Sequence, residues 1–234
     1  MRQAAFAERS RTAMKPIWKF RILALLVVVF VGGLSITNLV ANFLQPDPSP
    51  LPSRDSKAPS AQLVSSAKLV STIAPFRTDL KADYAIALAG QTLRSESSTQ
   101  TPDNDTAQDA VKSALKSGPH DSRMWLVLAL LQARKNLGAP LVAESLKMSY
   151  LTGPNRAELI PVRLDSVTVS NALNDGDLNE LARSDVRAIL TQYPDQRRAL
   201  ISDYVRGSAI GKKFLEESSR MLDPAFADSL RNAK

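Results

Sequence analysis

The stretch AQDAVKSALKSGPHDSRMW, residues 107–125, decides the fold, because its pattern returns as VAESLKMSYLTGPNRAELI at residues 142–160. The two stretches are offset by 35 residues, and each runs from a helix-forming segment through a Gly-Pro turn into a second segment. The matched positions are Lys112 with Lys147, Val111 with Leu146, Leu115 with Tyr150, Gly118 with Gly153, and Pro119 with Pro154. A helix–turn–helix unit of this period is typical of helical-hairpin solenoids, in which each hairpin buries its apolar face on the next.

Helical patterns continue on both sides of this repeat. Start and stop signals predict helices at residues 80–93, 106–116, 122–137, 141–151, 178–190, 196–206, 209–222 and 224–231, and one that begins near Ile160 with Pro161 in its first turn. The predicted N-terminal caps are Asp105 with Gln108, Asp121, and Asp177 with Glu180. No alternating apolar run is long enough to predict a strand, so the chain is expected to be all-α.

The first repeat unit resembles the tetratricopeptide-repeat (TPR) family. Trp125, Leu128 and Ala129 stand where that family has its Trp-x2-Leu-Gly run. The other likenesses are Asn136-Leu137-Gly138 at the turn between its two helices and Pro154 near its closing proline. The departures are Gln132 in place of Tyr, Leu141 and Ser145 in place of Ala and Phe, and Ile160-Pro161 where the second unit lacks its Trp. The resemblance covers about residues 79–190 and implies a short TPR-like α-α hairpin solenoid, which is a packing unit and not an activity.

A solenoid of this kind presents a concave surface lined mainly by the first helix of each hairpin. We expect that surface to bind a protein or peptide partner, with Arg123, Gln132 and Lys135 as the first contact residues. An N-terminal anchor followed by such repeats resembles the layout of several bacterial cell-envelope proteins, among them assembly factors for cytochrome c maturation, division and polysaccharide export. The expected function is a non-enzymatic interaction scaffold, an accessory factor in an envelope assembly or export complex. The alternative is an accessory subunit of an envelope glycan enzyme or of cytochrome c maturation.

The anchor is the run ILALLVVVFVGGLSITNLVANFL at residues 22–44, which holds 23 residues without a charge. At about 1.5 Å per residue, such a helix crosses the ~30 Å hydrocarbon core of a bilayer. The run is longer than the apolar region of a signal peptide, so a retained single-pass transmembrane helix is expected. Residues 1–21 hold six Lys or Arg and one acid, which places this tail in the cytoplasm. The rest of the chain is then expected on the periplasmic side of the inner membrane.

The anchor has two faces that suggest contact with another helix. Small side chains recur every fourth residue at Gly33, Thr37 and Ala41. A polar stripe lies beside them, formed by Ser35, Asn38 and Asn42. Small stripes allow close helix approach, and asparagines in hydrocarbon need hydrogen-bond partners, so association through this face is a further hypothesis. The alternative is that Asn38 and Asn42 lie in the outer headgroup zone.

Residues 45–62, QPDPSPLPSRDSKAPSAQ, form a Pro-rich linker between the anchor and the helical domain at 63–234. Alternating prolines lack the backbone donors that a helix needs and favour an extended, semi-rigid spacer. The sequence therefore predicts that the domain is held away from the bilayer.

Composition narrows the chemistry. The chain has no cysteine and one histidine, which excludes thiolate and multi-histidine metal sites, and no cofactor is expected. Its carboxylates, such as Asp165, Asp175, Asp177, Glu180 and Asp185, have no spacing that distinguishes them from a helix surface, so an enzyme is not expected. The net charge of +7 lies mostly in the N-terminal tail, and no pattern of interleaved aromatic and basic residues predicts nucleic-acid binding.

Overall fold

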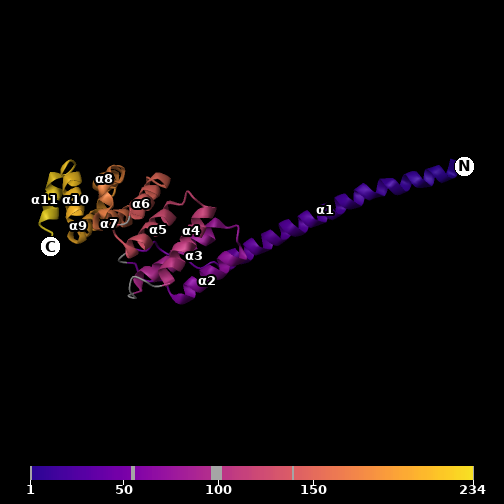
Figure 1. Ribbon diagram of the computed structural model, residues 1–234, viewed down its shortest axis with the longest axis horizontal. Helices are drawn as coiled ribbons and strands as arrows, with labels where there is room; N and C mark the ends of the chain where they lie inside the picture. The colour runs from indigo at the N-terminus through magenta and orange to yellow at the C-terminus, as the bar shows by residue number, and fades with distance from the viewer. Residues whose placement is uncertain (1, 54–55, 96–101, 139, 234) are drawn as a thin grey trace.

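The computed structural model describes residues 2–53, 56–95, 102–138 and 140–233, and within these ranges the protein is all-helical, without a strand (Figure 1). The α-helices are α1 Arg2–Leu44, α2 Ala61–Ile73, α3 Thr78–Arg94, α4 Pro102–Ser117, α5 Ser122–Lys135, α6 Pro140–Thr152, α7 Ile160–Val169, α8 Gly176–Thr191, α9 Arg197–Arg206, α10 Ala209–Arg220 and α11 Pro224–Arg231. Two short 3-10 turns lie at Asn171–Asn174 and Pro194–Gln196.

Helix α1 projects away from the rest of the molecule as a single long rod (Figure 1). Its segment Trp18–Leu44, 27 residues long, is apolar enough to cross a membrane, and no other helix among the described residues meets that test. Most of its large apolar side chains, from Leu23 to Phe43, are exposed, as expected of a helix that packs against lipid. This segment includes the predicted anchor and extends it by four residues toward the N-terminus.

Helices α2 to α11 form one helical domain with two main apolar clusters. The first cluster joins α3, α4 and α5, with Ile86, Val111 and Leu131 at its centre. The second extends from α5 to α11 and includes Leu146 and Leu164. In the N-terminal half, α3 packs along α4 and α5 packs along α6, so that each pair is an antiparallel hairpin (Figure 1).

The predicted helices all lie where helices are found, but α3, α4 and α8 begin two to four residues earlier than predicted. Helix α4 begins at Pro102, one turn before the predicted 106–116, because a proline at the first position and acids in the first turn both favour a helix start. Helix α8 is capped by Asp175, whose side chain accepts a hydrogen bond from the Leu178 backbone N–H. The predicted cap, Asp177, lies inside the first turn instead.

The Pro-rich segment between α1 and α2 packs against the helical domain. Pro52 is buried, and Leu51 contacts both apolar clusters. Gly90 of α3 lies against Pro59 and Pro52, where a Cβ would come within 3.0 Å of the Pro59 ring. The described part of this segment therefore contributes to the core, in addition to joining the anchor to the domain.

Candidate functional site

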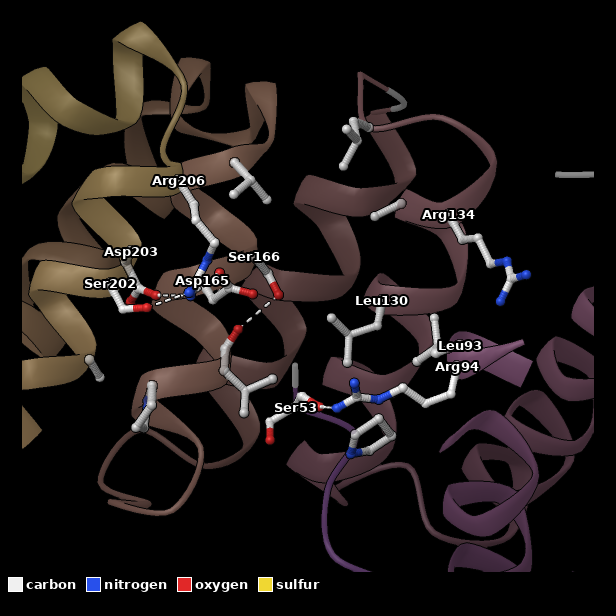
Figure 2. A pocket seen from close by; sticks show the side chains of 17 residues that line it. Ser53, Leu93, Arg94, Leu130, Arg134, Asp165, Ser166, Ser202, Asp203 and Arg206 are labelled. Atoms are coloured by element: carbon white, nitrogen blue, oxygen red, sulfur yellow. Dashed lines mark hydrogen bonds and ion pairs between the residues drawn. The ribbon is translucent and has the colours of Figure 1, made fainter. Parts of the chain in front are cut away.

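A cavity with a volume of about 500 Å³ lies where four helices converge. Alternate helices α3, α5, α7 and α9 supply its walls, and Pro52 and Ser53 of the linker close one side (Figure 2). When the helices from α3 to α10 are taken in consecutive pairs, α3, α5, α7 and α9 are the first helix of each pair. The cavity is therefore a groove along one face of the helical domain and not a gap within one hairpin.

Apolar side chains form much of the groove. Leu130, Ala133 and Leu137 line it from α5 and its C-terminal turn, at a spacing of three and four residues. This is the spacing of one helix face, which is why α5 presents them together. Val162 faces the groove from α7 and Leu93 from α3. A volume of this size, walled by apolar groups, suits a few apolar side chains of a ligand.

One end of the groove carries a compact ion cluster. Arg206 of α9 donates through Nη2 to Asp165 Oδ1 of α7 at 2.9 Å and to Asp203 Oδ1 at 3.0 Å (Figure 2). It also donates to the hydroxyl of Ser202. The cluster ties α7 to α9 and places both charge signs at the rim.

The other end of the groove is basic. Arg94 of α3 donates to the backbone carbonyl of Ser53, which fixes the linker against α3 (Figure 2). Arg134 of α5 donates to the backbone carbonyls of Thr92 and Ser95, at 2.9 Å to Ser95. Both arginines line the groove, and their guanidinium groups bind backbone carbonyl oxygens.

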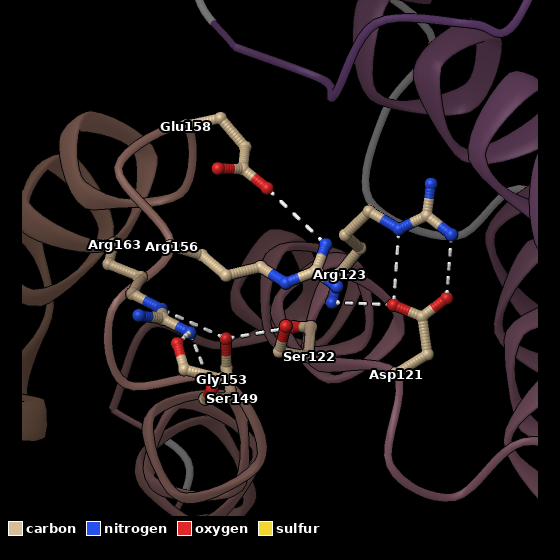
Figure 3. Close-up of polar contacts among 8 residues, drawn as sticks. All are labelled: Asp121, Ser122, Arg123, Ser149, Gly153, Arg156, Glu158 and Arg163. Carbon is tan, nitrogen blue, oxygen red and sulfur yellow. Dashed lines mark hydrogen bonds and ion pairs between the residues drawn. The ribbon is translucent and has the colours of Figure 1, made fainter.

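The three residues that the sequence predicted for partner contact do not line this groove. Arg123 makes a two-point ion pair with Asp121, at 3.1 Å from Nε and 2.8 Å from Nη2 (Figure 3). Gln132 accepts a hydrogen bond at Oε1 from the Ser145 hydroxyl at 2.9 Å, and Lys135 forms an ion pair with Asp105. All three side chains serve contacts between neighbouring helices or within a helix cap.

Asp121 and Arg123 each stabilise the charged form of the other. Burial acts to raise the pKa of the Asp121 carboxyl, but the hydrogen bond and charge of Arg123 outweigh burial, so this pKa lies below its ordinary value. The same hydrogen bond holds the pKa of Arg123 above its ordinary value. Both groups are charged at neutral pH, and Asp121 also caps α5 by accepting from the Arg123 backbone N–H, which confirms the predicted cap.

A buried arginine, which the sequence analysis did not single out, organises the turn between α6 and α7. Arg163 is fully buried, and its Nε donates to Ser149 Oγ at 3.0 Å (Figure 3). Its Nη2 donates to the backbone carbonyls of Ser149 and Gly153, at 2.9 Å for Gly153. The centroid of the Tyr150 ring lies 4.5 Å from the guanidinium carbon. These contacts stabilise the Gly-Pro turn that the sequence repeat contains.

Asp185 of α8 is the acid of this buried region. Burial raises the pKa of its carboxyl to about 7, although the charge of Arg163 and the influence of the nearby Tyr150 side chain lower it. Its exposed fraction of 2% keeps it out of reach of a substrate. Asp185 is therefore part of the polar core of the domain.

The other carboxylates on which an enzyme would depend are engaged in ion pairs. Asp175 and Asp177 both bind Lys147, at 2.8 and 3.1 Å. Glu180 lies 3.5 Å from Arg183.

His120 is exposed on the turn before α5. In the described parts of the chain, no group of three His, Asp or Glu side chains is placed to hold a metal ion.

The six residues predicted to form the small and polar stripes of the anchor have different surroundings along α1. Nothing outside α1 lies within 4 Å of the Cβ position of Gly33. Each polar side chain in the middle of the span donates to a carbonyl of its own helix, as Ser35 does to Val31, Thr37 to Leu34, and Asn38 to Leu34. Ala41 and Asn42 instead contact α2 and the α2–α3 turn. Two of the six positions therefore contact the chain's own helical domain.

Comparison with protein-family models, curated proteins and solved structures finds no match to this chain. The fold and the site together define an all-helical protein with one N-terminal helix able to span a membrane and a four-helix groove on its remaining domain.

Proposed function

We propose that this protein is a membrane-anchored, non-enzymatic scaffold that binds a segment of a partner protein in the groove between α3, α5, α7 and α9. The observation that carries the proposal is the groove itself, with apolar walls, a volume of about 500 Å³ and charged groups of both signs at its ends. Such a surface matches an extended peptide that inserts apolar side chains and meets polar groups at the rim.

The TPR-like reading of the domain belongs to this proposal. It is supported by the 35-residue sequence repeat and by the antiparallel pairing of α3 with α4 and of α5 with α6. It is also supported by the alternation of lining helices, because the first helix of each hairpin would face the groove in a repeat solenoid. Partner binding in such domains requires no catalytic group.

The location is likewise proposed from α1 and its flanks. The apolar length of Trp18–Leu44 supports a single crossing, and the basic tail before it supports a cytoplasmic N-terminus. The helical domain then lies in the periplasm of a bacterial cell envelope, at the inner membrane. An anchor confines the encounter with a membrane-bound partner and raises its effective concentration.

The test is site-specific photo-crosslinking of the full chain in cell membranes. The probe replaces Leu137, which lines the groove and is 50% exposed, and the matched control probe replaces Leu151 of α6, which is 62% exposed and lies outside it. We expect a discrete protein adduct from position 137 and none from 151. Ala199→Trp, which fills the groove, should remove that adduct. Equal labelling at both positions, or an adduct unchanged by Ala199→Trp, would contradict the proposal.

The identity of the adduct distinguishes the accessory roles. A protein of an assembly or export complex would support the main proposal. A glycan enzyme or a component of cytochrome c maturation would support the alternative in which this chain is an accessory subunit.

A second candidate function is assembly through the face of α1. It is favoured by Gly33, which has open space around it, and by the run of polar side chains that continues to Asn38. Replacing residues 22–38 by polyleucine removes this face but keeps Ala41 and Asn42, which contact the chain's own domain. Retained function after this exchange would favour the groove, and lost function would favour the helix face.

A further inference from the structure

The end of α1 is packed against the helical domain. Ala41 is fully buried in a small cluster with Val70, Ala74 and Leu80. The next residue, Asn42, accepts a hydrogen bond at 2.8 Å from Arg77 Nη1. Residues 74–77, the turn between α2 and α3, therefore lie beside residues 41–42 of α1.

This contact fixes the depth of the turn relative to a bilayer. The apolar segment Trp18–Leu44 has 27 residues and is about 40 Å long at 1.5 Å per residue, against a hydrocarbon core of about 30 Å. When the segment is centred on the bilayer, roughly three residues at each end extend beyond the hydrocarbon. Ala41 then lies at the outer boundary between acyl chains and headgroups, and the α2–α3 turn lies at the same depth.

The side chains exposed at this depth suit a lipid interface. Phe76, in the turn, is 80% exposed, and Leu69 on α2 is 56% exposed. Ile73 lies between them in the sequence and is half-buried. Lys68, beside Leu69, is also exposed. Apolar side chains that enter the boundary region, with a long cationic side chain that reaches the headgroup phosphates, are typical of interfacial membrane contacts.

We propose that Leu69 and Phe76 insert into the outer face of the same membrane that α1 crosses, with Lys68 at the lipid phosphates. The inference rests on the proposed membrane anchor and extends it, because it makes the helical domain a second, peripheral membrane contact. It differs from the expectation of a domain held away from the bilayer by its linker. The surface is continuous with α1 through Ala41 and Asn42, which identifies its occupant as the surrounding lipid.

Spin-label accessibility tests this inference in the full chain, which has no cysteine and therefore accepts single labels cleanly. The labelled variants are Phe76→Cys and Leu69→Cys at the proposed contact, Val29→Cys within the span, and Leu151→Cys on α6, away from α1 in Figure 1. Each is reconstituted into vesicles of phosphatidylethanolamine and phosphatidylglycerol. Power saturation then compares collisions of the label with oxygen, which enters lipid, and with a nickel chelate, which stays in water.

We expect the oxygen-to-nickel ratio at positions 69 and 76 to be several-fold higher than at 151 and lower than at 29. A ratio at 69 and 76 equal to that at 151, with position 29 shielded from nickel, would overturn the interfacial contact and leave the anchor intact. If position 29 is itself open to nickel, both the anchor and this inference are wrong.

Discussion

Gly211 marks a close approach of α10 to α7. A Cβ at this position of α10 would overlap the backbone of Thr168 in α7, whose carbonyl oxygen accepts hydrogen bonds from both the N–H and the hydroxyl of Ser208 at 2.9 Å. We therefore expect Gly211→Ala to force the two backbones apart and to lower the free energy of unfolding by about 1–3 kcal/mol. Urea unfolding of the full chain in detergent micelles measures this change.

Gly176 is the matched control at the residue scale. It is the first residue of α8, and nothing lies within 4 Å of its Cβ position. Gly176→Ala should leave stability unchanged or raise it by up to ~1 kcal/mol, because alanine loses less backbone entropy in a helix. A similar loss in both variants would show that the α7–α10 contact is not the cause.

Asp185 makes the free energy of unfolding of the domain depend on pH, and the direction of its pKa shift determines the sign of that dependence. Its pKa of about 7 in the folded protein exceeds the ordinary value of 3.8, so the folded state holds the proton over a wider pH range than the unfolded state. The free energy of unfolding should fall as pH rises from about 4 to 7, by up to ~1.4 kcal/mol per pH unit. In Asp185→Asn this contribution should be absent. Parallel unfolding series of both proteins over that range provide the measurement, and superimposable slopes would contradict the assignment.

At the scale of elements, the linker is the segment whose role changes most from expectation. Leu51 packs against both apolar clusters, so Leu51→Ala should lower the free energy of unfolding by roughly 1–2 kcal/mol, less than the ~2–5 kcal/mol of a fully buried leucine. Pro48, which is exposed, is the control, and Pro48→Ala should have little effect. Equal stability of the Leu51→Ala variant and the parent would mean that the linker is a free spacer. Thermal unfolding of the three chains distinguishes these outcomes.

The elements themselves follow largely from local sequence signals. Helix α11 has the predicted bounds, Pro224–Arg231, because an Asp-Pro start and a short amphipathic run specify it locally. The start of α4 differs from the prediction because residues 95–106, which include its first turn, have the composition of a loop. The packing of Leu51 and Pro52 was missed because it depends on the spacing of α3 and α5, which no local pattern encodes.

The candidate site was less accessible to prediction for the same reason. The repeat predicts a concave surface lined by first helices, but Arg123, Gln132 and Lys135 of the first helix α5 do not line the groove. The groove side of α5 is decided by the positions of α7 and α9, which lie 24 or more residues further along the chain. Leu130, Ala133 and Leu137 do carry a helical spacing, and that spacing was the available signal.

For the whole molecule, the contact at Ala41 should hold the anchor and the domain at one angle. We expect a narrow distance distribution between spin labels at Val29→Cys and Leu151→Cys in the otherwise unaltered chain. Ala41→Leu should broaden it, because the larger side chain does not fit a position with no exposed surface. Val40→Leu, at a position 40% exposed, should not. Double electron–electron resonance in vesicles measures these distributions, and equal widths in all three chains would contradict the contact.

Helix α1 continues unbroken to Leu44, and its last turn is packed on α2. The rotation of the anchor about its own axis therefore determines the direction in which the groove opens. One residue inserted within residues 22–38 would turn the earlier part of the helix by about 100° relative to the domain, whereas seven residues, about two turns, would nearly restore it. The number of residues in the anchor, and not only its hydrophobicity, then sets which neighbour in the plane of the membrane the groove can face.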